Sequence, residues 1–191
     1  MPGLSPLIRL WRADLYRYHG RSDVRTLVET LIVHPGYRTT FAMRACAHLT
    51  AGRGRLARLP ALLVMRRYER LFGIAVPFDA EIGEGFYIPH YGGIVVNPGV
   101  RIGRNCNMSQ QVTIGRSNRG RRVGVPTIGD NVYLGPGAKI VGGITIGDNV
   151  AVGANCVVVD DVPANAVVAG VPGRVVSETR GAEGYVNNTD Y

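Results

Sequence analysis

The sequence lacks the long apolar runs and the cysteine patterns that mark several classes of protein. No run reaches the ~18 apolar residues that a bilayer-spanning helix needs, and the opening Met1-Pro2-Gly3-Leu4 is unlike a signal peptide. Only three cysteines occur in 191 residues, and no two of them stand at CxxC spacing. This argues against a disulfide framework and against a zinc site, and we expect a cytoplasmic protein.

Acidic residues are also few. Asp and Glu number 14 against 22 Lys and Arg, which gives a net charge of +8 and a pI of about 9.9. A positive field of this kind can attract nucleic acid, an anionic membrane surface or a phosphorylated small molecule. The sequence has no basic helix, zinc finger or ladder of stacking aromatic residues, so we expect no nucleic-acid partner. The arginine-rich N-terminal third leaves a membrane surface as the lesser alternative, and we favour a phosphorylated cofactor because of the family resemblance given below.

A six-residue repeat occupies the stretch from Ile128 to Pro163. An aliphatic residue opens every hexad and a second small or aliphatic residue follows four places later, and the string IGDNV occurs at both Ile128 and Ile146. This periodicity predicts a parallel β-helix, in which each hexad is a strand plus a turn and three hexads close one triangular coil. Cys106 and Cys156 stand at the fifth place of a hexad, which predicts small core residues.

Two interruptions break the hexads that begin at Ile82. The step from Ile94 to Ile102 is eight residues, and the step from Ile114 to Ile128 is fourteen. The second insertion is rich in glycine and arginine, so we expect residues 115–127 to leave the coil as an extruded loop. Solenoids carry their function where such insertions interrupt the repeat.

The N-terminal part shows helical rather than six-residue periodicity. We expect helices over residues 7–18, 24–32, 37–49 and 60–71, the last opening at Pro60, and the arginines of residues 53–70 are most simply a solvated face. The predicted organisation is a helical segment over 1–72, a β-helix over 73–176 and a flexible tail over 177–191. The fold class is therefore mainly β, a parallel β-helix with an N-terminal α-helical segment.

The hexads, the extruded loop and the closing Ala169-Gly-Val-Pro-Gly-Arg resemble the hexapeptide-repeat acyltransferases. The stretch His90-Tyr-Gly-Gly-Ile-Val-Val, together with His34-Pro-Gly-Tyr-Arg and Ala47-His-Leu, is similar to the serine O-acetyltransferases. The resemblance implies a left-handed β-helix, and acetyl-CoA as co-substrate without a metal. It also implies a homotrimer, alone or as a dimer of trimers, with the cofactor in a groove between subunits.

The resemblance further implies that His90 is the catalytic base for transfer of an acetyl group to a hydroxyl. An imidazole can accept a hydroxyl proton near neutral pH. Neither core-type cysteine is placed as a nucleophile beside His90, so direct transfer in a ternary complex is expected. The expected cofactor-binding residues are Gly115, Gly135, Pro136, Ala138, Ala154, Gly170, Val171, Pro172 and Arg174. The expected substrate-binding residues are Asp23, Tyr91, Gly92 and Arg122.

The sequence departs from the serine enzymes where they hold serine and orient the base. Pro89 replaces the acid that precedes the catalytic histidine, and Gly124-Val125 replaces the Arg-His pair of the loop. The carboxylate that orients the histidine falls near Ala75, with Asp79 as the closest acid. The pattern looks more like the serine-acetyltransferase-like proteins of polysaccharide and other secondary pathways.

Several functions therefore stay open. The acceptor is L-serine, a related hydroxy compound or a sugar hydroxyl, and a trimeric scaffold without activity is the alternative from another class. A scaffold should not bind acetyl-CoA. A γ-type carbonic anhydrase needs three histidine ligands for zinc, whereas the predicted coil holds only His90, so we exclude that function.

Overall fold

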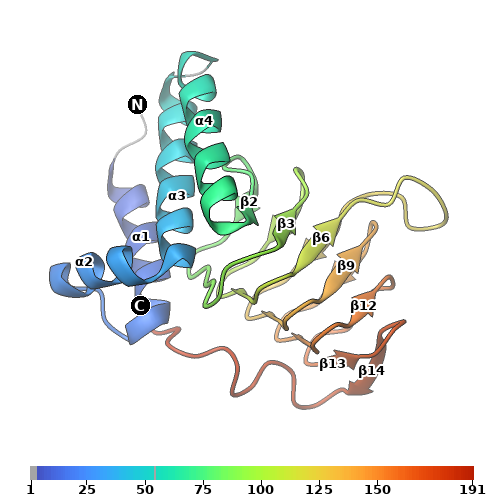
Figure 1. The fold of residues 1–191 in the computed structure, drawn as a ribbon. Coiled ribbons are helices and arrows are strands. Elements are labelled where there is room, and N and C mark those ends of the chain that lie inside the picture. Colours follow the sequence, from blue (N-terminus) through green and yellow to red (C-terminus); the bar gives the residue numbers. More distant parts are fainter. Residues whose placement is uncertain (1–3, 54) are drawn as a thin grey trace.

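The computed structural model describes residues 4–53 and 55–191, and shows four helices followed by a coil of short strands (Figure 1). Residues 1–3 and 54, which belong to the predicted helical segment, lie outside the described part. Within that part, no helix combines the length and the apolarity needed to cross a membrane. The helices are α1 (Leu4–His19), α2 (Val24–Val33), α3 (Pro35–Arg53) and α4 (Arg55–Phe72).

Local sequence signals explain where most of these helices begin. Asp23 caps α2, because its carboxylate accepts hydrogen bonds from the backbone N–H of Thr26 (3.0 Å) and from the hydroxyl of the same residue (2.7 Å). Pro35 is the first residue of α3, a position where its missing N–H costs nothing. Pro60 does not open α4 as predicted but lies inside its second turn. Leucine, alanine and arginine precede it, and these strong helix formers extend the helix back to Arg55.

The coil is a left-handed parallel β-helix, as the hexads and the resemblance predicted. Three sheets form its sides, and all pairs are parallel except β13 with β14. The first sheet contains β1 (Ile74–Ala75), β3 (Ile94–Val96), β6 (Thr113–Gly115), β9 (Lys139–Val141) and β12 (Val157–Val158). The second contains β2 (Glu81–Ile82), β4 (Arg101–Ile102), β7 (Thr127–Ile128) and β10 (Thr145–Ile146). The third contains β5 (Asn107–Met108), β8 (Tyr133–Leu134), β11 (Ala151–Val152), β13 (Val167–Ala169) and β14 (Arg174–Ser177).

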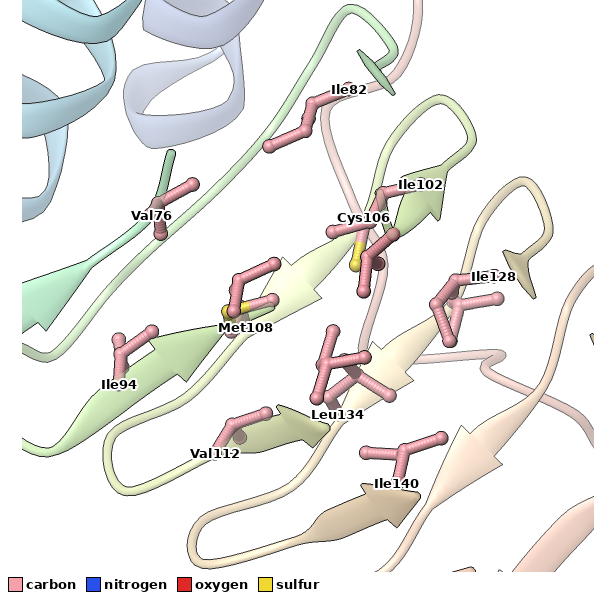
Figure 2. Close-up of a cluster of buried hydrophobic side chains, with 14 of the residues drawn as sticks. Val76, Ile82, Ile94, Ile102, Cys106, Met108, Val112, Ile128, Leu134 and Ile140 are labelled. Atoms are coloured by element: carbon pink, nitrogen blue, oxygen red, sulfur yellow. The ribbon is translucent and has the colours of Figure 1, made fainter. Parts of the chain in front are cut away.

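The residues that open the hexads form the core. Ile102, Ile128 and Ile146 are partners in successive strands of the second sheet, and Figure 2 shows the inward aliphatic side chains stacked coil upon coil. Cys106 and Cys156 are fully buried in this core. Burial raises the pKa of the Cys106 thiol to about 12, so this side chain acts as a small neutral core residue.

A buried ion pair joins the helices to the first coil. The guanidinium of Arg44 in α3 lies 3.1 Å from the carboxylate of Asp14 in α1, and both side chains are almost completely buried. Arg44 also donates to the carbonyls of Ile82 and Gly83 (both 2.5 Å), while Asp14 accepts from the backbone N–H of Phe86 (2.8 Å). The two charges therefore satisfy backbone groups of the coil as well as each other.

The C-terminal residues are ordered against the coil, so the prediction of a flexible tail over 177–191 is wrong. The tail runs back along the corner between the second and third sheets towards α1 (Figure 1). Tyr185 stacks on Tyr133 with ring centroids 4.2 Å apart, and the guanidinium of Arg17 donates to the carbonyl of Asn187 (2.7 Å). Asparagines with positive φ turn the chain at this corner, and their side chains supply partners that a solvated tail would find in water.

Candidate active site

His90 lies on the turn that enters β3 from the third-sheet side of the first coil. The hydroxyl of Tyr18 in α1 donates to the carbonyl of Ile88 (2.9 Å), and the N–H of Gln111 in the next coil donates to the carbonyl of Gly92 (2.8 Å). The turn is thus held at both ends, while the imidazole of His90 is exposed. The fold presents this side chain to solvent from a fixed backbone.

Open space adjoins the turn on the side of the glycines. Gly92 and Gly93 have φ of 104° and 68°, which glycine adopts without strain. A Cβ built on Gly92 would meet nothing within 4 Å. Tyr91 is 56% exposed and packs edge-on against Phe72 of α4 (6.1 Å between centroids). Tyr91 and Gly92 therefore border a free surface next to His90.

The His90 turn is the first of a column of turns between the third and first sheets. Backbone hydrogen bonds link the column: Gly137 N–H donates to Gln110 (3.0 Å), and Asn155 N–H donates to Pro136 (2.8 Å). Neighbouring coils of a sheet are ~4.8 Å apart, so the turn at residues 135–138 lies roughly 10 Å from the His90 turn, and the turn at residues 170–173 roughly 19 Å. A long ligand can therefore run along this corner and end at His90.

The inserted loop is at a different corner, between the first and second sheets. It leaves β6 after Gly115 and re-enters at β7, so residues 116–126 are outside the strands. Ser117 and Gly124 exchange two backbone hydrogen bonds of 3.0 Å, and the Arg122 guanidinium pairs with Asp161 (2.7 Å). The loop is an ordered hairpin, and within one chain it lies across the first sheet from the His90 corner.

Comparisons with known proteins bear on this arrangement. Residues 126–160 match the family model described as "Bacterial transferase hexapeptide (six repeats)". The chain is 36% identical over 152 residues to a serine acetyltransferase of Synechococcus elongatus, covering 80% of this chain and 61% of the relative. It is 36% identical over 159 residues to a serine acetyltransferase of Mycobacterium tuberculosis, covering 83% and 68%. The chain belongs to the serine acetyltransferase family.

Solved structures of this family share the fold along nearly the whole chain. The serine acetyltransferase of Neisseria gonorrhoeae in complex with serine superposes with a TM-score of 0.77 and 30% identity, covering 91% of this chain and 70% of that one. The Brucella abortus enzyme in complex with coenzyme A gives a TM-score of 0.79 at 27% identity, covering 92% and 69%. The chain spans about 61% of the length of the Synechococcus relative.

Most of the expected cofactor residues fall on the His90 corner. Six lie at least partly exposed along the column: Pro136, Ala154, Gly170, Val171, Pro172 and Arg174. Gly135 is buried, and a Cβ there would lie 2.7 Å from the carbonyl of Val152, so coil packing already requires this glycine. Gly115 ends β6 on the opposite side of the first sheet.

Ala138 is the cofactor prediction that the structure contradicts. Its side chain is fully buried in the core. Its N–H donates to Gly135, and its carbonyl accepts from Thr113. No part of Ala138 is free to line a groove, because the fifth place of a hexad points inward.

Two expected substrate residues are held by contacts with other side chains. The carboxylate of Asp23 is the N-cap of α2, and its hydrogen bonds from Thr26 lower its pKa. Arg122 is at the loop corner, paired with Asp161. Of the expected substrate residues, Tyr91 and Gly92 follow His90 directly in its turn.

The departures from the family pattern leave the His90 turn without an acid. Ala75 in β1 pairs with Val95 in β3, and the nearby Asp79 is bound to Arg58 (2.9 Å). No cluster of three metal-binding side chains occurs among residues 4–53 and 55–191. Across the residues that the structure describes, His90 makes no side-chain hydrogen bond to a carboxylate.

The structure adds residues that the sequence reasoning did not place here. His34 and His19 lie around Tyr18, with the His34 ring 5.1 Å from Tyr18 and 5.7 Å from His19. Burial and the charge of His19 lower the pKa of His34. Lys139 also joins the column, because its ammonium donates to the carbonyl of Gln111. The position of His34 before the Pro-Gly break was the one available signal, since that break brings α3 against the coil.

Proposed function

We propose that this protein is an acetyl-CoA-dependent O-acetyltransferase that transfers acetyl directly to the hydroxyl of L-serine or of a related hydroxy compound. The observation that carries the proposal is the exposed His90 on a rigid turn at one end of a column of turns, in a chain of the serine acetyltransferase family. Relatives of this fold have been solved with serine and with coenzyme A.

In the proposed reaction His90 acts as general base. Its imidazole accepts the proton of the acceptor hydroxyl as the oxygen attacks the thioester carbonyl. The resulting oxyanion needs donors, and the N–H groups of Gly92 and Gly93 form no backbone hydrogen bonds within the described part of the chain. As the intermediate collapses, the C–S bond breaks and the imidazolium returns its proton to the leaving thiolate. The ester and coenzyme A are the products.

Coenzyme A would lie along the column from Arg174 to the His90 turn. Its phosphates suit the guanidinium of Arg174, which is exposed at the far end. Lys139 offers a second cation closer to His90. Pro136 and Ala154 are small residues at the intervening turns, where the pantetheine arm can approach the backbone.

The proposed assembly is a homotrimer, alone or paired as a dimer of trimers. Within one chain His90 and the loop with Arg122 stand at different corners of the triangular coil. A threefold arrangement can bring the loop corner of one subunit to the His90 corner of its neighbour. The site would then be completed only between subunits.

A sugar hydroxyl is the second candidate acceptor. Holding an amino acid calls for charged partners, whereas this loop has Gly124 and Val125 before its proline, and β1 has Ala75. A neutral polyol needs no such charges.

An acetyl-CoA consumption screen over serine, homoserine and sugar acceptors tests the proposal. We expect thiol release with one acceptor class and its loss in His90→Ala. A protein that does not bind acetyl-CoA in calorimetry would instead be a scaffold, and the proposal would be wrong.

A further inference from the structure

The outer face of α4 carries a row of exposed leucines that continues into arginines. Leu56, Leu59 and Leu63 are 90%, 64% and 60% exposed, and Arg67 and Arg70 follow them at helical spacing and are also exposed. We call this row of five residues the α4 stripe. Apolar side chains gathered on one exposed face usually mark an interaction surface.

The stripe is ordered along the helix axis. The leucines lie in the half of α4 that projects away from the coils, and Arg67 and Arg70 lie in the half nearer the coil (Figure 1). Arg55 and Arg58 also belong to the leucine half. Leu59 and Arg70 are roughly 16 Å apart along the axis at 1.5 Å per residue. An apolar cavity of about 460 Å³ opens beside the leucines and is lined by Cys46, Leu49, Leu56, Ala57, Pro60, Ala61 and Val64.

We propose that the α4 stripe docks the protein on an anionic membrane surface. A surface helix with an apolar face lies along the membrane interface, with that face against the acyl boundary and its arginines among the phosphate groups. The leucine side chains of the α4 stripe face the acyl boundary, and Arg67 and Arg70 remain among the headgroups. This inference does not depend on the proposed acetyltransferase activity.

Charge favours lipid over a second copy of the chain. Glu69 is the one acid in the sequence of α4, and it is paired with Arg66 at 2.8 Å. Two stripes packed together, parallel or antiparallel, would therefore offer Arg67 and Arg70 no acidic partner. Anionic headgroups supply that partner for both arginines.

The α2 helix provides a matched control. Val28 and Ile32 are 51% and 69% exposed on its outer face, but the neighbouring Arg25 is neutralised by Glu29 at 2.9 Å. This face is apolar without a net positive charge. A variant of this α2 face therefore tests whether vesicle binding needs the α4 stripe or follows from any exposed apolar residues.

Flotation of the full chain with vesicles tests the proposal. We expect partitioning into phosphatidylglycerol-containing vesicles at low salt, weaker binding to pure phosphatidylcholine and weaker binding at high salt. Leu59→Ser/Leu63→Ser should lower the partition coefficient roughly 10-fold or more, and Arg67→Gln/Arg70→Gln roughly 10- to 30-fold. Val28→Ser/Ile32→Ser should leave it unchanged.

Circular dichroism and urea unfolding of each variant show that the fold is retained. The proposal is overturned if the wild-type chain does not float with anionic vesicles, or if the α2 variant loses binding equally. It is also overturned if Leu59→Ser/Leu63→Ser only lowers the oligomeric state, which would make the stripe a contact between copies.

Discussion

Removing Arg44 should unfold the junction between the helices and the coil. In Arg44→Met, Asp14 loses the guanidinium at 3.1 Å and keeps the Phe86 N–H, while the carbonyls of Ile82 and Gly83 lose their donor. Breaking a buried pair by removing one partner costs ~3–5 kcal/mol, because a charge is left buried without compensation. We expect this loss in the free energy of unfolding at pH 7.5, measured in urea at fixed protein concentration.

The pH dependence of Arg44→Met separates the charge from the packing. Burial raises the pKa of Asp14 and Arg44 opposes that rise, so in the variant the folded pKa lies above the unfolded value of about 3.9. The ionised carboxylate then costs stability, and the loss should shrink as pH falls from 7.5 towards 4.5. Asp14→Asn/Arg44→Met, which removes both charges, should be more stable than the single variant at pH 7.5. The reasoning would be refuted if the free energy of unfolding of Arg44→Met lay within ~1 kcal/mol of wild type, because that is well below the range for a broken buried pair. It would also be refuted if the double variant were no more stable than Arg44→Met.

Three further predictions address the site and the tail. His90→Ala should lower kcat roughly 10²–10⁴-fold with unchanged acetyl-CoA affinity. Steady-state kinetics measures the first quantity and calorimetry the second. Wild-type turnover in the variant would mean that His90 is only structural. Gly36→Ala places a Cβ 2.0 Å from the carbonyl of Ile88. It should cost ~1–3 kcal/mol in urea unfolding and lower kcat, because Ile88 begins the His90 turn; a neutral result would mean that α3 moves freely. Tyr185→Ala removes the stack on Tyr133, and such a stack contributes ~0.5–1.5 kcal/mol beyond its buried area. The variant should therefore be cleaved faster in the tail when proteolysis is followed by mass spectrometry. An unchanged cleavage rate would mean that Tyr185 does not hold the tail against the coil.

The hexads made the β-helix and its core predictable from sequence. A side chain that opens a hexad must point inward to stack on the equivalent residue of the next coil, and Ile128 and Ile146 do so as partners in one sheet. The same rule applies to the fifth place, where Cys106 and Cys156 were assigned to the core. Ala138 holds the fifth place of the hexad that opens at Leu134. The hexad pattern therefore predicts its burial in the core and argues against placing it in a cofactor groove.

Contacts between distant segments were not predictable in this way. The tail has no repeat, and its binding depends on Arg17 of α1 and on Tyr133 of the coil, which lie far from it in sequence. Asp23 is a comparable case, because an acid before a helix serves as a cap whether or not a ligand is near. Tertiary partners decide such roles, and a single sequence does not state them.

Counting hexads in threes carries the sequence further than individual motifs do. Every third hexad returns to the same side of the triangle, so the turns after Ile88, Leu134 and Val152 share one corner, as the third sheet shows. The loop follows Ile114 and so falls at the next corner, with Gly115 at its base. The count alone therefore places the candidate coenzyme A turns with His90 and separates both from the loop. In the proposed trimer the loop of one subunit meets the His90 corner of its neighbour, and this links the proposed assembly to the proposed acceptor site.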